Sequence, residues 1–470
     1  MEKQHIHLIG ICGTAMASLA GMLKQLGYKV TGSDAAAYPP MSDFLRALSI
    51  PVSQPFDENN LQPRPDVVVV GNAISRGNVE LEQVLDERIA MRSLPQVLQE
   101  YFLRTREPIV VAGTHGKTTT TSMLAWIFQV AGLEPSFLIG GIAENFGSSF
   151  ALRQGKHFII EGDEYDTAFF DKGPKFLHYM PRTVLLTHVE FDHADIYADL
   201  EAVKTSFKRL INLVPRRGKI VAFDGSAAVK ECVSKAFAPV EFYGFSPEAA
   251  WRIAELELLP EHTRWKLLRN GKLWGEFEYP LAGAYNVLNA TGAAAIAAHY
   301  GIEQSVIARA LATFKSVKRR LEVRDEVNGI TIIDDFAHHP TAIAATLEAV
   351  RTRYPGRRLW AVFEPRSNTL RRKIFQKDLV ASLAMADEIV VAGVFHPETV
   401  PEAERLDTAA VVAALRRQKK PARELPDADA IVAAIAPQLL SGDVVVILSN
   451  GAFGNIYEKL PQRLRSEVPA

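Results

Sequence analysis

The sequence predicts an α/β protein with three domains. Apolar segments that suit buried strands alternate with helical patterns along most of the 470 residues, as is typical of parallel sheets covered by helices. Polar residues 104–108 interrupt the first alternation, and basic residues 315–320 interrupt the second. We expect a Rossmann-like domain at 1–106, a central phosphate-loop domain at 107–316 and a second Rossmann-like domain at 317–470.

Composition is that of an ordinary globular protein. Hydrophobic residues make up 48% and charged residues 23%, and the formal net charge of −1 offers no basic field for nucleic acid. Cys12 and Cys232 are too few for a disulfide framework, as expected in a reducing compartment. The N-terminus has no signal-peptide pattern, and no apolar stretch suits a bilayer span. We therefore expect a cytoplasmic protein without nucleic-acid or membrane partners.

A glycine-bounded loop follows the apolar strand expected at residues 108–112. The loop ends in lysine and threonine and leads into a helical pattern at 118–131, which is the context of a phosphate-binding loop. Only Thr114 and His115 separate the two glycines, whereas the standard motif has four residues there. The combination predicts a nucleoside triphosphate bound by Gly113, Thr114, His115, Gly116, Lys117, Thr118 and Thr119.

The first domain opens with a strand–loop–helix–strand pattern that suits a nucleotide diphosphate. The strand at 6–9 is followed by a glycine-containing loop, a helix at 16–26 and a second strand that ends at Asp34. Cys12 and Ala15 stand where a nicotinamide-binding fingerprint has its second and third glycines. A nicotinamide dehydrogenase is therefore the weaker alternative, and it leaves the phosphate loop unexplained.

The central domain offers oxygen and imidazole ligands for magnesium. The strand at 157–160 ends in Glu161, with Asp163 and Glu164 as near alternatives, and such a cluster of carboxylates repels itself without a cation. Thr118 and His193 complete the expected metal set. We expect a glycine-rich loop at 140–147 to lie nearby.

Short alternating strands then predict a small antiparallel insertion. They lie at 254–259 and 263–268 and are followed by an Asn-Gly hairpin signal at 270–271. An alanine-rich helix at 286–300 closes the central domain. The third domain shows the elements of a second α/β layer: strands at 330–333, 358–363, 388–391 and 443–448, a helix at 340–353 and a basic helix from Leu370.

Polar segments of the third domain are candidates for contacts across a cleft. Adjacent histidines point in different directions, and no further ligand cluster is evident, so we interpret His338-His339 as a helix-entry loop that lines a cleft rather than a metal site. An arginine of the Arg319-Arg320 pair can clamp phosphate or carboxylate. Residues 364–368 can clamp a carboxylate-rich substrate.

These motifs together resemble the Mur ligase family, the ATP-dependent amide-bond-forming enzymes of peptidoglycan synthesis. Within that family, the first domain resembles the branch that takes UDP-N-acetylmuramate. The Tyr38-Pro39-Pro40 segment and residues 364–368 favour the tripeptide L-alanyl-γ-D-glutamyl-meso-diaminopimelate as the amine. L-alanine is the closest alternative, and a nucleotide-gated binding protein without ligase activity is a third. The resemblance covers essentially the whole chain and rests on 113–119, Glu161, Asp192-His193, 286–289, Arg319-Arg320 and 334–340.

The resemblance implies a role for each matching residue. Lys117, Glu161, His193 and Arg320 are expected to be catalytic, and Thr118, Glu161 and His193 to hold Mg²⁺. ATP is expected to bind the phosphate loop, Asn286, Asn289, Arg320 and Asp335. The two remaining substrates are assigned to Gly13, Thr14, Ser33, Asp34, Asn145, His338, Arg366 and Asn368. Some family members carry a carbamylated lysine, and we leave Lys204 and Lys208 unassigned in that role.

Overall fold

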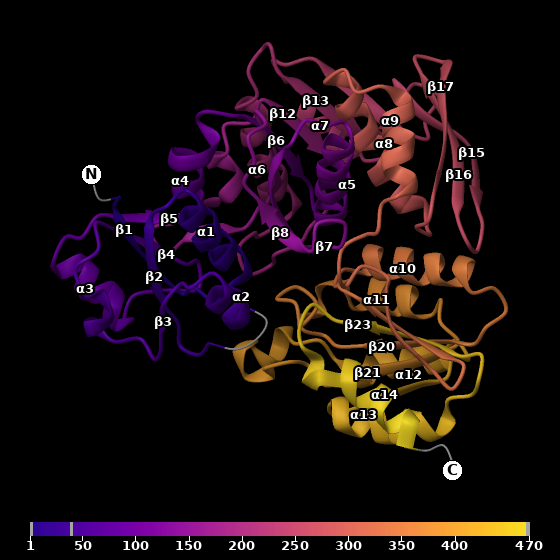
Figure 1. Ribbon diagram of the computed structural model, residues 1–470. Helices are drawn as coiled ribbons and strands as arrows, with labels where there is room; N and C mark the ends of the chain where they lie inside the picture. The colour runs from indigo at the N-terminus through magenta and orange to yellow at the C-terminus, as the bar shows by residue number, and fades with distance from the viewer. Residues whose placement is uncertain (1–2, 38–40, 467–470) are drawn as a thin grey trace.

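The computed structural model describes residues 3–37 and 41–466. Three α/β domains follow one another along the chain, each built on its own sheet, and the C-terminal domain lies below the central one in Figure 1. The Tyr38-Pro39-Pro40 segment falls outside the described residues. Within the described ranges, no helix is long and apolar enough to cross a membrane.

The N-terminal domain has a five-stranded parallel sheet in the order β3-β2-β1-β4-β5. Its strands are β1 (His5–Ile9), β2 (Lys29–Ser33), β3 (Val52–Ser53), β4 (Val67–Val70) and β5 (Met91–Ser93). Its helices are α1 (Thr14–Gln25), α2 (Met41–Ala47), α3 (Val79–Asp86) and α4 (Leu94–Leu98). Leu19 and Leu23 of α1 share one buried cluster with Phe158 of the central domain, so the two domains pack through a continuous apolar core.

The central domain has a ten-stranded sheet in the order β17-β16-β15-β14-β13-β12-β6-β9-β7-β8. Its strands are β6 (Glu107–Ala112), β7 (Ser136–Ala143), β8 (Ser148–Ala151), β9 (His157–Gly162), β12 (Thr183–Leu186), β13 (Lys219–Phe223), β14 (Val240–Gly244), β15 (Trp251–Leu258), β16 (Thr263–Arg269) and β17 (Lys272–Tyr279). Its helices are α5 (Lys117–Val130), α6 (Leu200–Asn212), α7 (Ala227–Val233), α8 (Ala284–His299) and α9 (Gln304–Ala312). A separate pair, β10 (Asp166–Ala168) and β11 (Asp171–Pro174), forms a small hairpin.

Strand β6 lies inside this sheet, and its side chains alternate between two cores. Val110 and Ala112 join the cluster that contains α6, whereas Ile109 and Val111 join the cluster that contains α5 and α8. Burial on both faces explains the unbroken apolar run before the phosphate loop.

Two segments of the central domain differ from the expected pattern. The strands expected as an antiparallel insertion continue the main sheet, because β15 pairs in parallel with β14 before β16 and β17 turn back. The hairpin at Asn270 and Gly271 is confirmed, with φ of 50° and 77°. Gly140 and Gly141 lie in β7 rather than in a loop, because this strand bends past Leu138 and pairs again at Ala143.

The C-terminal domain has a six-stranded sheet in the order β18-β19-β23-β20-β21-β22, parallel except for β18. Its strands are β18 (Glu322–Val327), β19 (Ile330–Asp335), β20 (Leu359–Phe363), β21 (Glu388–Ala392), β22 (Ala422–Leu425) and β23 (Val444–Leu448). Its helices are α10 (Pro340–Arg353), α11 (Gln376–Leu383), α12 (Thr408–Arg417), α13 (Ala428–Ile435) and α14 (Ile456–Ser466). The helix expected from Leu370 begins only at Gln376, because Arg372 forms an extended bridge with Arg405.

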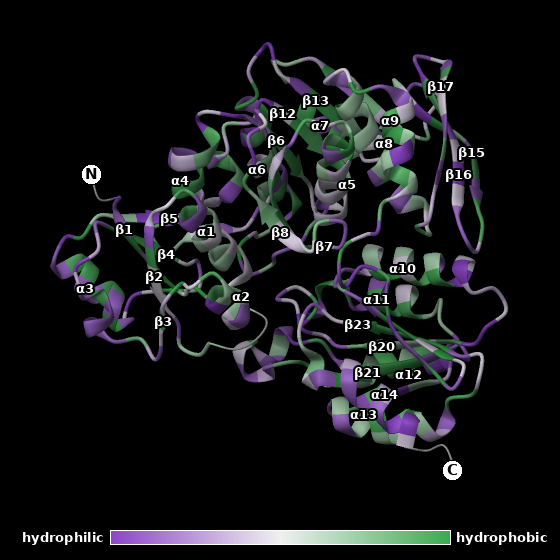
Figure 2. Ribbon diagram, viewed as in Figure 1, coloured by the Kyte–Doolittle hydropathy of each residue, from purple (hydrophilic) through white to green (hydrophobic). Residues whose placement is uncertain are grey.

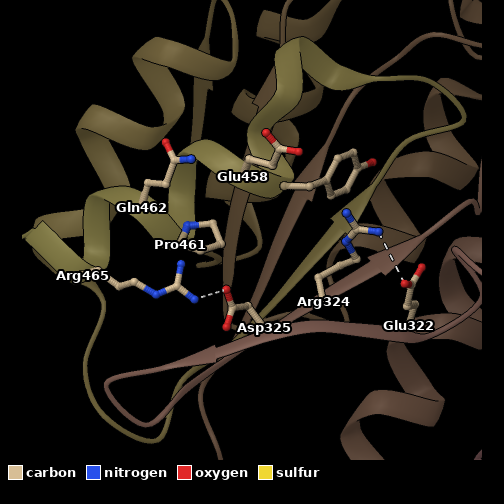
Figure 3. A pocket seen from close by; sticks show the side chains of 8 residues that line it. Glu322, Arg324, Asp325, Glu458, Pro461, Gln462 and Arg465 are labelled. Atoms are coloured by element: carbon tan, nitrogen blue, oxygen red, sulfur yellow. Dashed lines mark hydrogen bonds and ion pairs between the residues drawn. The ribbon is translucent and has the colours of Figure 1, made fainter. Parts of the chain in front are cut away.

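Hydropathy follows this layering. In Figure 2 green gathers on the strands inside the sheets, whereas the outer strands β15 and β16 and the helices carry both green and purple. A pocket lies between β18 and α14 (Figure 3), where Arg324 pairs with Glu322 and Arg465 pairs with Asp325. This pocket contains none of the residues expected to bind ATP or substrate.

Candidate active site

The phosphate loop leaves no room for side chains at its two glycines. Gly113 has a φ of 133°, and a Cβ there would come within 2.2 Å of Thr187 Oγ1. Gly116 has a φ of 79°, and a Cβ there would come within 2.5 Å of Asn289 Oδ1. Both glycines therefore permit a positive φ and a close approach that other residues do not.

The segment that follows β12 holds this loop in place. Thr114 N donates to His188 O at 2.7 Å, and Thr187 Oγ1 donates to His115 O at 2.6 Å. Gly116 is the N-cap of α5, and among the described residues no side chain caps this helix. The N–H groups of the first turn of α5 are therefore available for phosphate oxygens.

Thr118 and Glu161 form the expected oxygen pair beside the loop. Thr118 Oγ1 donates to Glu161 Oε1 at 2.8 Å, and Gly140 N donates to Glu161 Oε2 at 2.7 Å. Burial raises the pKa of Glu161, and the negative charge of Asp163 raises it further. A divalent cation beside these oxygens would offset both effects, so the pair fits Mg²⁺.

Lys117 and His193 both contact the carboxylate of Glu164. The sequence offered Glu164 only as an alternative to Glu161 as a magnesium ligand. Lys117 Nζ lies 2.9 Å from Glu164 Oε2, and His193 Nε2 lies 3.5 Å from Glu164 Oε1. Burial favours a neutral Lys117, but the negative charges of Glu164, Asp163 and Glu161 together outweigh this effect and raise the pKa of the lysine. Burial also opposes ionisation of Glu164, yet Lys117 and then His193 lower its pKa below the ordinary value.

The carboxylate cluster obtains positive charge from lysines. Besides the Lys117–Glu164 pair, Lys175 Nζ lies 3.4 Å from Asp163 Oδ2 and 3.9 Å from the centroid of the Tyr165 ring. Contrary to what their spacing in the sequence indicates, these carboxylates therefore do not need a metal ion to coexist, because two ammonium groups already offset their repulsion.

Arg320 reaches the phosphate loop from the C-terminal domain. Its Nη2 donates to Thr118 Oγ1 at 3.4 Å. Arg319 instead binds within its own domain, to Asp334 at 3.1 Å and to the carbonyl of Ser449 at 2.7 Å. Only one arginine of the pair therefore faces the nucleotide-binding loop.

Asp335 is buried in the interior of the C-terminal domain. Its Oδ2 accepts from Leu321 N at 2.8 Å, and its Oδ1 accepts from Ala337 N at 2.9 Å and from Thr346 Oγ1 at 3.1 Å. Burial raises the pKa of this carboxyl group, although the charge of Arg320 lowers it in part. In this structure the carboxylate orders the segment before β18 and the turn after β19.

Asn286 and Asn289 lie one above the other on α8, next to the phosphate loop. Both are buried, and Asn289 Nδ2 lies 3.3 Å from Asn286 Oδ1. Asn286 Nδ2 donates to Ala282 O at 2.9 Å. The close approach of Gly116 places Asn289 beside the loop that the sequence assigns to ATP.

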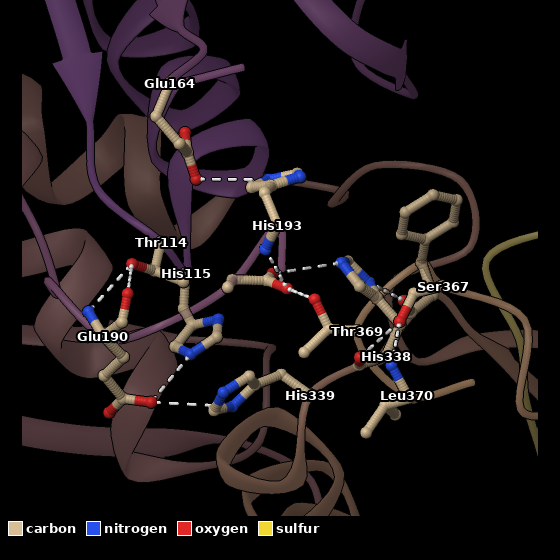
Figure 4. Close-up of polar contacts among 12 residues, drawn as sticks. Thr114, His115, Glu164, Glu190, His193, His338, His339, Ser367, Thr369 and Leu370 are labelled. Carbon is tan, nitrogen blue, oxygen red and sulfur yellow. Dashed lines mark hydrogen bonds and ion pairs between the residues drawn. The ribbon is translucent and has the colours of Figure 1, made fainter. Parts of the chain in front are cut away.

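Several contacts join the central and C-terminal domains near the site (Figure 4). Thr369 Oγ1 donates to Asp192 Oδ1 at 2.6 Å, and Ala194 N donates to Thr369 Oγ1 at 3.3 Å. His338 Nε2 lies 3.8 Å from Asp192 Oδ2, and Asn368 Nδ2 donates to Asp195 Oδ2 at 2.6 Å. His338 and Asn368, expected to bind substrate, therefore contribute to the domain interface in this structure.

The residues expected to bind UDP lie at the start of α1 and the end of β2. Gly13 and Thr14 are exposed where α1 begins. Asp34 Oδ2 accepts from Cys12 N at 2.8 Å and so fixes the first loop. Ser33 is fully buried and hydrogen-bonds to Glu80, so in this structure its side chain binds within the N-terminal domain.

Asn145 and Arg366 also make contacts within the protein. Asn145 Nδ2 donates to Thr313 O at 2.9 Å, and its Oδ1 accepts from Lys315 N at 2.8 Å. These bonds use both ends of the amide to hold the connection to the third domain. The guanidinium of Arg366 lies 3.6 Å from the centroid of the Phe395 ring.

The two lysines left unassigned on α6 act as ammonium groups in this structure. Lys204 pairs with Glu201 and Glu231, and Lys208 Nζ lies 2.6 Å from Glu231 Oε1. A carbamylated lysine carries negative charge, so at either position it would face glutamate carboxylates instead of a metal ion.

Sequence reasoning missed three contacts that shape the site. Glu164 binds Lys117, Thr369 binds Asp192, and Glu190 lies between His115 and His339. The signal for Glu164 was its carboxylate two residues after β9. The other two contacts join residues from different domains, and no short motif contains both partners.

Comparison with known proteins identifies the family. The Mur ligase family catalytic domain matches residues 5–106, the Mur ligase middle domain matches 111–297, and the Mur ligase glutamate ligase domain matches 319–451. The chain therefore belongs to the Mur ligase family. The resemblance inferred from its motifs and the three-domain α/β fold are both confirmed.

Three relatives that match nearly the full length of this chain are ligases of UDP-N-acetylmuramate or murein peptides by name. The UDP-N-acetylmuramate–L-alanyl-γ-D-glutamyl-meso-2,6-diaminoheptandioate ligase of Escherichia coli is 42% identical over 99% of this chain and 99% of its own. The UDP-N-acetylmuramate–L-alanine ligase of Methylococcus capsulatus is 33% identical over 100% of this chain and 98% of its own. The crystal structure of a murein peptide ligase from Psychrobacter arcticus matches with a TM-score of 0.73 and 36% identity, covering 99% of this chain and 100% of that one.

Proposed function

We propose that this chain is an ATP-dependent, ADP-forming ligase that joins UDP-N-acetylmuramate to L-alanyl-γ-D-glutamyl-meso-diaminopimelate. The new amide links the muramyl carboxylate to the free amine of the tripeptide. The relatives of nearly full length support this choice, since the tripeptide ligase is more similar to the chain than the L-alanine ligase is. We place the reaction in the cytoplasm, where ATP is available, and the thiols of Cys12 and Cys232 are free.

The observation that carries the proposal is the position of the Thr118 hydroxyl. It lies between Glu161 of the central domain, at 2.8 Å, and Arg320 of the C-terminal domain, at 3.4 Å. A γ-phosphate beside this hydroxyl would contact Arg320 of the C-terminal domain. The positive charge of the arginine would then stabilise the negative charge that develops during phosphoryl transfer. The proposed domain division is 1–106, 107–316 and 317–470.

The phosphate loop and the residues around it would share the binding of ATP and Mg²⁺. Lys117 and the backbone of residues 113–119 would hold the ATP phosphates, and Asn289 with Asn286 would contact adenine. Thr118, Glu161 and His193 would hold Mg²⁺, which supplies positive charge to the phosphates. Since Lys117 is paired with Glu164 in this structure, phosphate binding requires the lysine to share or exchange that partner.

The reaction we propose has two steps. The muramyl carboxylate attacks the γ-phosphorus in line, which gives an acyl phosphate and ADP. The tripeptide amine then attacks the acyl carbon, and phosphate leaves. Because an acyl phosphate hydrolyses in water, the contacts between Thr369 and Asp192 and between Arg320 and Thr118 would help to exclude solvent while it forms.

Release of ADP with different amines tests the proposal. With ATP, Mg²⁺ and UDP-N-acetylmuramate, we expect fast ADP release with the tripeptide and slow release with L-alanine or with no amine. Faster release with L-alanine would overturn the substrate assignment. Positional isotope exchange in the γ-phosphate, with UDP-N-acetylmuramate and no amine, separately tests the acyl phosphate.

A further inference from the structure

Three side chains from distant parts of the chain meet at the boundary between the central and C-terminal domains. His115 comes from the phosphate loop, Glu190 from the segment after β12, and His339 from the N-cap of α10. One ligand atom from each residue lies within 4.8 Å of the other two. No local motif contains this cluster, because Thr341, two residues after His339, lies 151 residues from Glu190 along the chain.

Glu190 lies at the centre of the cluster. Its Oε2 lies 3.1 Å from His115 Nε2 and 3.5 Å from His339 Nδ1, and the two imidazole centroids are 4.7 Å apart (Figure 4). Thr341 Oγ1 donates to the same carboxylate oxygen at 2.9 Å, which fixes its position. The geometry gathers one carboxylate and two imidazoles in a space that suits a single ion.

One ring nitrogen of His339 has no hydrogen-bond partner in the described protein. Its side chain is 5% exposed, and its Nε2 has no hydrogen-bond partner among the described residues. Thr341 N donates to its Nδ1 at 3.3 Å, so that atom serves as an acceptor while it also faces the carboxylate of Glu190. In the tautomer that accepts from Thr341 N, Nε2 carries the proton and is a buried donor without an acceptor. In the other tautomer Nδ1 carries the proton and cannot cap α10, and Nε2 is a buried acceptor without a donor.

The charges in the cluster also suit a cation. Burial lowers the pKa of His339 to about 4, so this imidazole is neutral near pH 7. Burial opposes ionisation of Glu190, but its hydrogen bond with His115 and the charges nearby lower its pKa to about 2. Neutral imidazole and ionised carboxylate are the forms that bind metal ions.

We propose that His115, Glu190 and His339 form a binding site for a transition-metal ion such as Zn²⁺. Two histidines and one glutamate make up a recurrent zinc donor set, whereas Mg²⁺ prefers oxygen ligands such as Thr118 and Glu161. Because His115 and Glu190 belong to the central domain and His339 to the C-terminal domain, the bound ion would join the two. Occupancy would hold α10 against the phosphate loop and oppose domain opening.

Cobalt binding to the full-length chain tests this site. Metal-free protein is titrated with Co²⁺ in excess Mg²⁺, which occupies the oxygen ligands, and visible absorption reports imidazole-bound Co²⁺. The test variants are His339→Asn, which keeps an acceptor for Thr341 N–H, and Glu190→Gln, which keeps an acceptor for the Thr341 hydroxyl. The control is His396→Gln, which changes an exposed histidine that also pairs with a glutamate, Glu398, at 2.9 Å.

We expect wild type and the control variant to bind one equivalent of Co²⁺, which Zn²⁺ displaces, and to unfold at a higher temperature with Zn²⁺ present. Both test variants should bind at least about 100-fold more weakly and should lose the thermal shift. Absence of Co²⁺ binding to wild type, or equal binding by either natively folded test variant, would overturn the site. If His339→Asn fails to fold, as judged by circular dichroism, Glu190→Gln decides alone.

Discussion

The hydroxyl of Thr369 donates a buried 2.6 Å hydrogen bond to Asp192, although 177 residues separate the two along the chain. Asp192 belongs to the Asp-His motif of the central domain, and Thr369 follows β20 of the C-terminal domain. This bond ties the third domain to the segment that carries His193. The arrangement of the two domains therefore depends on a threonine that no sequence motif singled out.

Replacing Thr369 with valine should weaken the closed arrangement. The change keeps the shape of the side chain but leaves a buried carboxylate without this donor, which costs about 1–3 kcal/mol. We expect kcat to fall by roughly 5- to 150-fold, with native secondary structure retained. The control is Thr352→Val, which removes a hydroxyl that bonds only within α10. An unchanged kcat in Thr369→Val would show that this bond does not support closure.

Replacing Lys117 with methionine should abolish most phosphoryl transfer. Loss of a positive charge at the transferring phosphate lowers kcat by about 10²–10³-fold. The variant also leaves Glu164 with less compensation, so the free energy of unfolding should fall. A double variant with Glu164→Gln should recover stability without recovering kcat, and Lys172→Met, at an exposed lysine, serves as the control. Substantial activity in Lys117→Met would contradict the assigned role.

Replacing Arg320 with lysine should separate charge from geometry. The positive charge remains, but the planar donor group that reaches Thr118 is lost. We expect kcat to fall by about 10- to 100-fold with little change in the KM for ATP, since the contact comes from the second domain and matters most on closure. Arg324→Lys, outside the nucleotide site, should behave as wild type. Steady-state kinetics distinguish this outcome from a simple loss of ATP affinity.

His157 should make stability depend on pH. Burial against Phe128 and Tyr300 lowers its pKa from 6.5 to about 4. Between about pH 6.5 and pH 4 the imidazole is protonated in the unfolded chain but remains neutral in the folded chain. The free energy of unfolding therefore falls as pH falls from about 6.5 to about 4. The full contribution is about 3 kcal/mol.

Denaturant titrations across this pH range test the effect. His157→Leu should flatten the pH dependence, because the buried site no longer excludes a proton. The exposed His396→Gln variant should keep the slope of wild type. An equal slope in His157→Leu and wild type would assign the effect to other groups.

Local patterns sufficed for much of the fold and for the core of the site. The apolar run of β6, the glycines at 113 and 116 and the helix after them are contiguous, so their geometry follows from the backbone itself. The Asn270-Gly271 hairpin was predictable for the same reason. The helix expected from Leu370 was wrong because a bridge to Arg405, far along the chain, holds Arg372 extended.

The sequence by itself determined the three α/β domains, the strand–loop–helix at residues 108–130 and the placement of Thr118 and Glu161 beside this loop, because each depends on residue types at short spacing or at the ends of adjacent strands. Only the tertiary structure decided which partners these residues have. It placed Glu164 on Lys117, buried Ser33, turned Arg319 inward and Arg320 toward Thr118, and brought His339 to His115 and Glu190. Those contacts cross domains or sheet layers, and their distances are set by how the domains pack rather than by any local pattern.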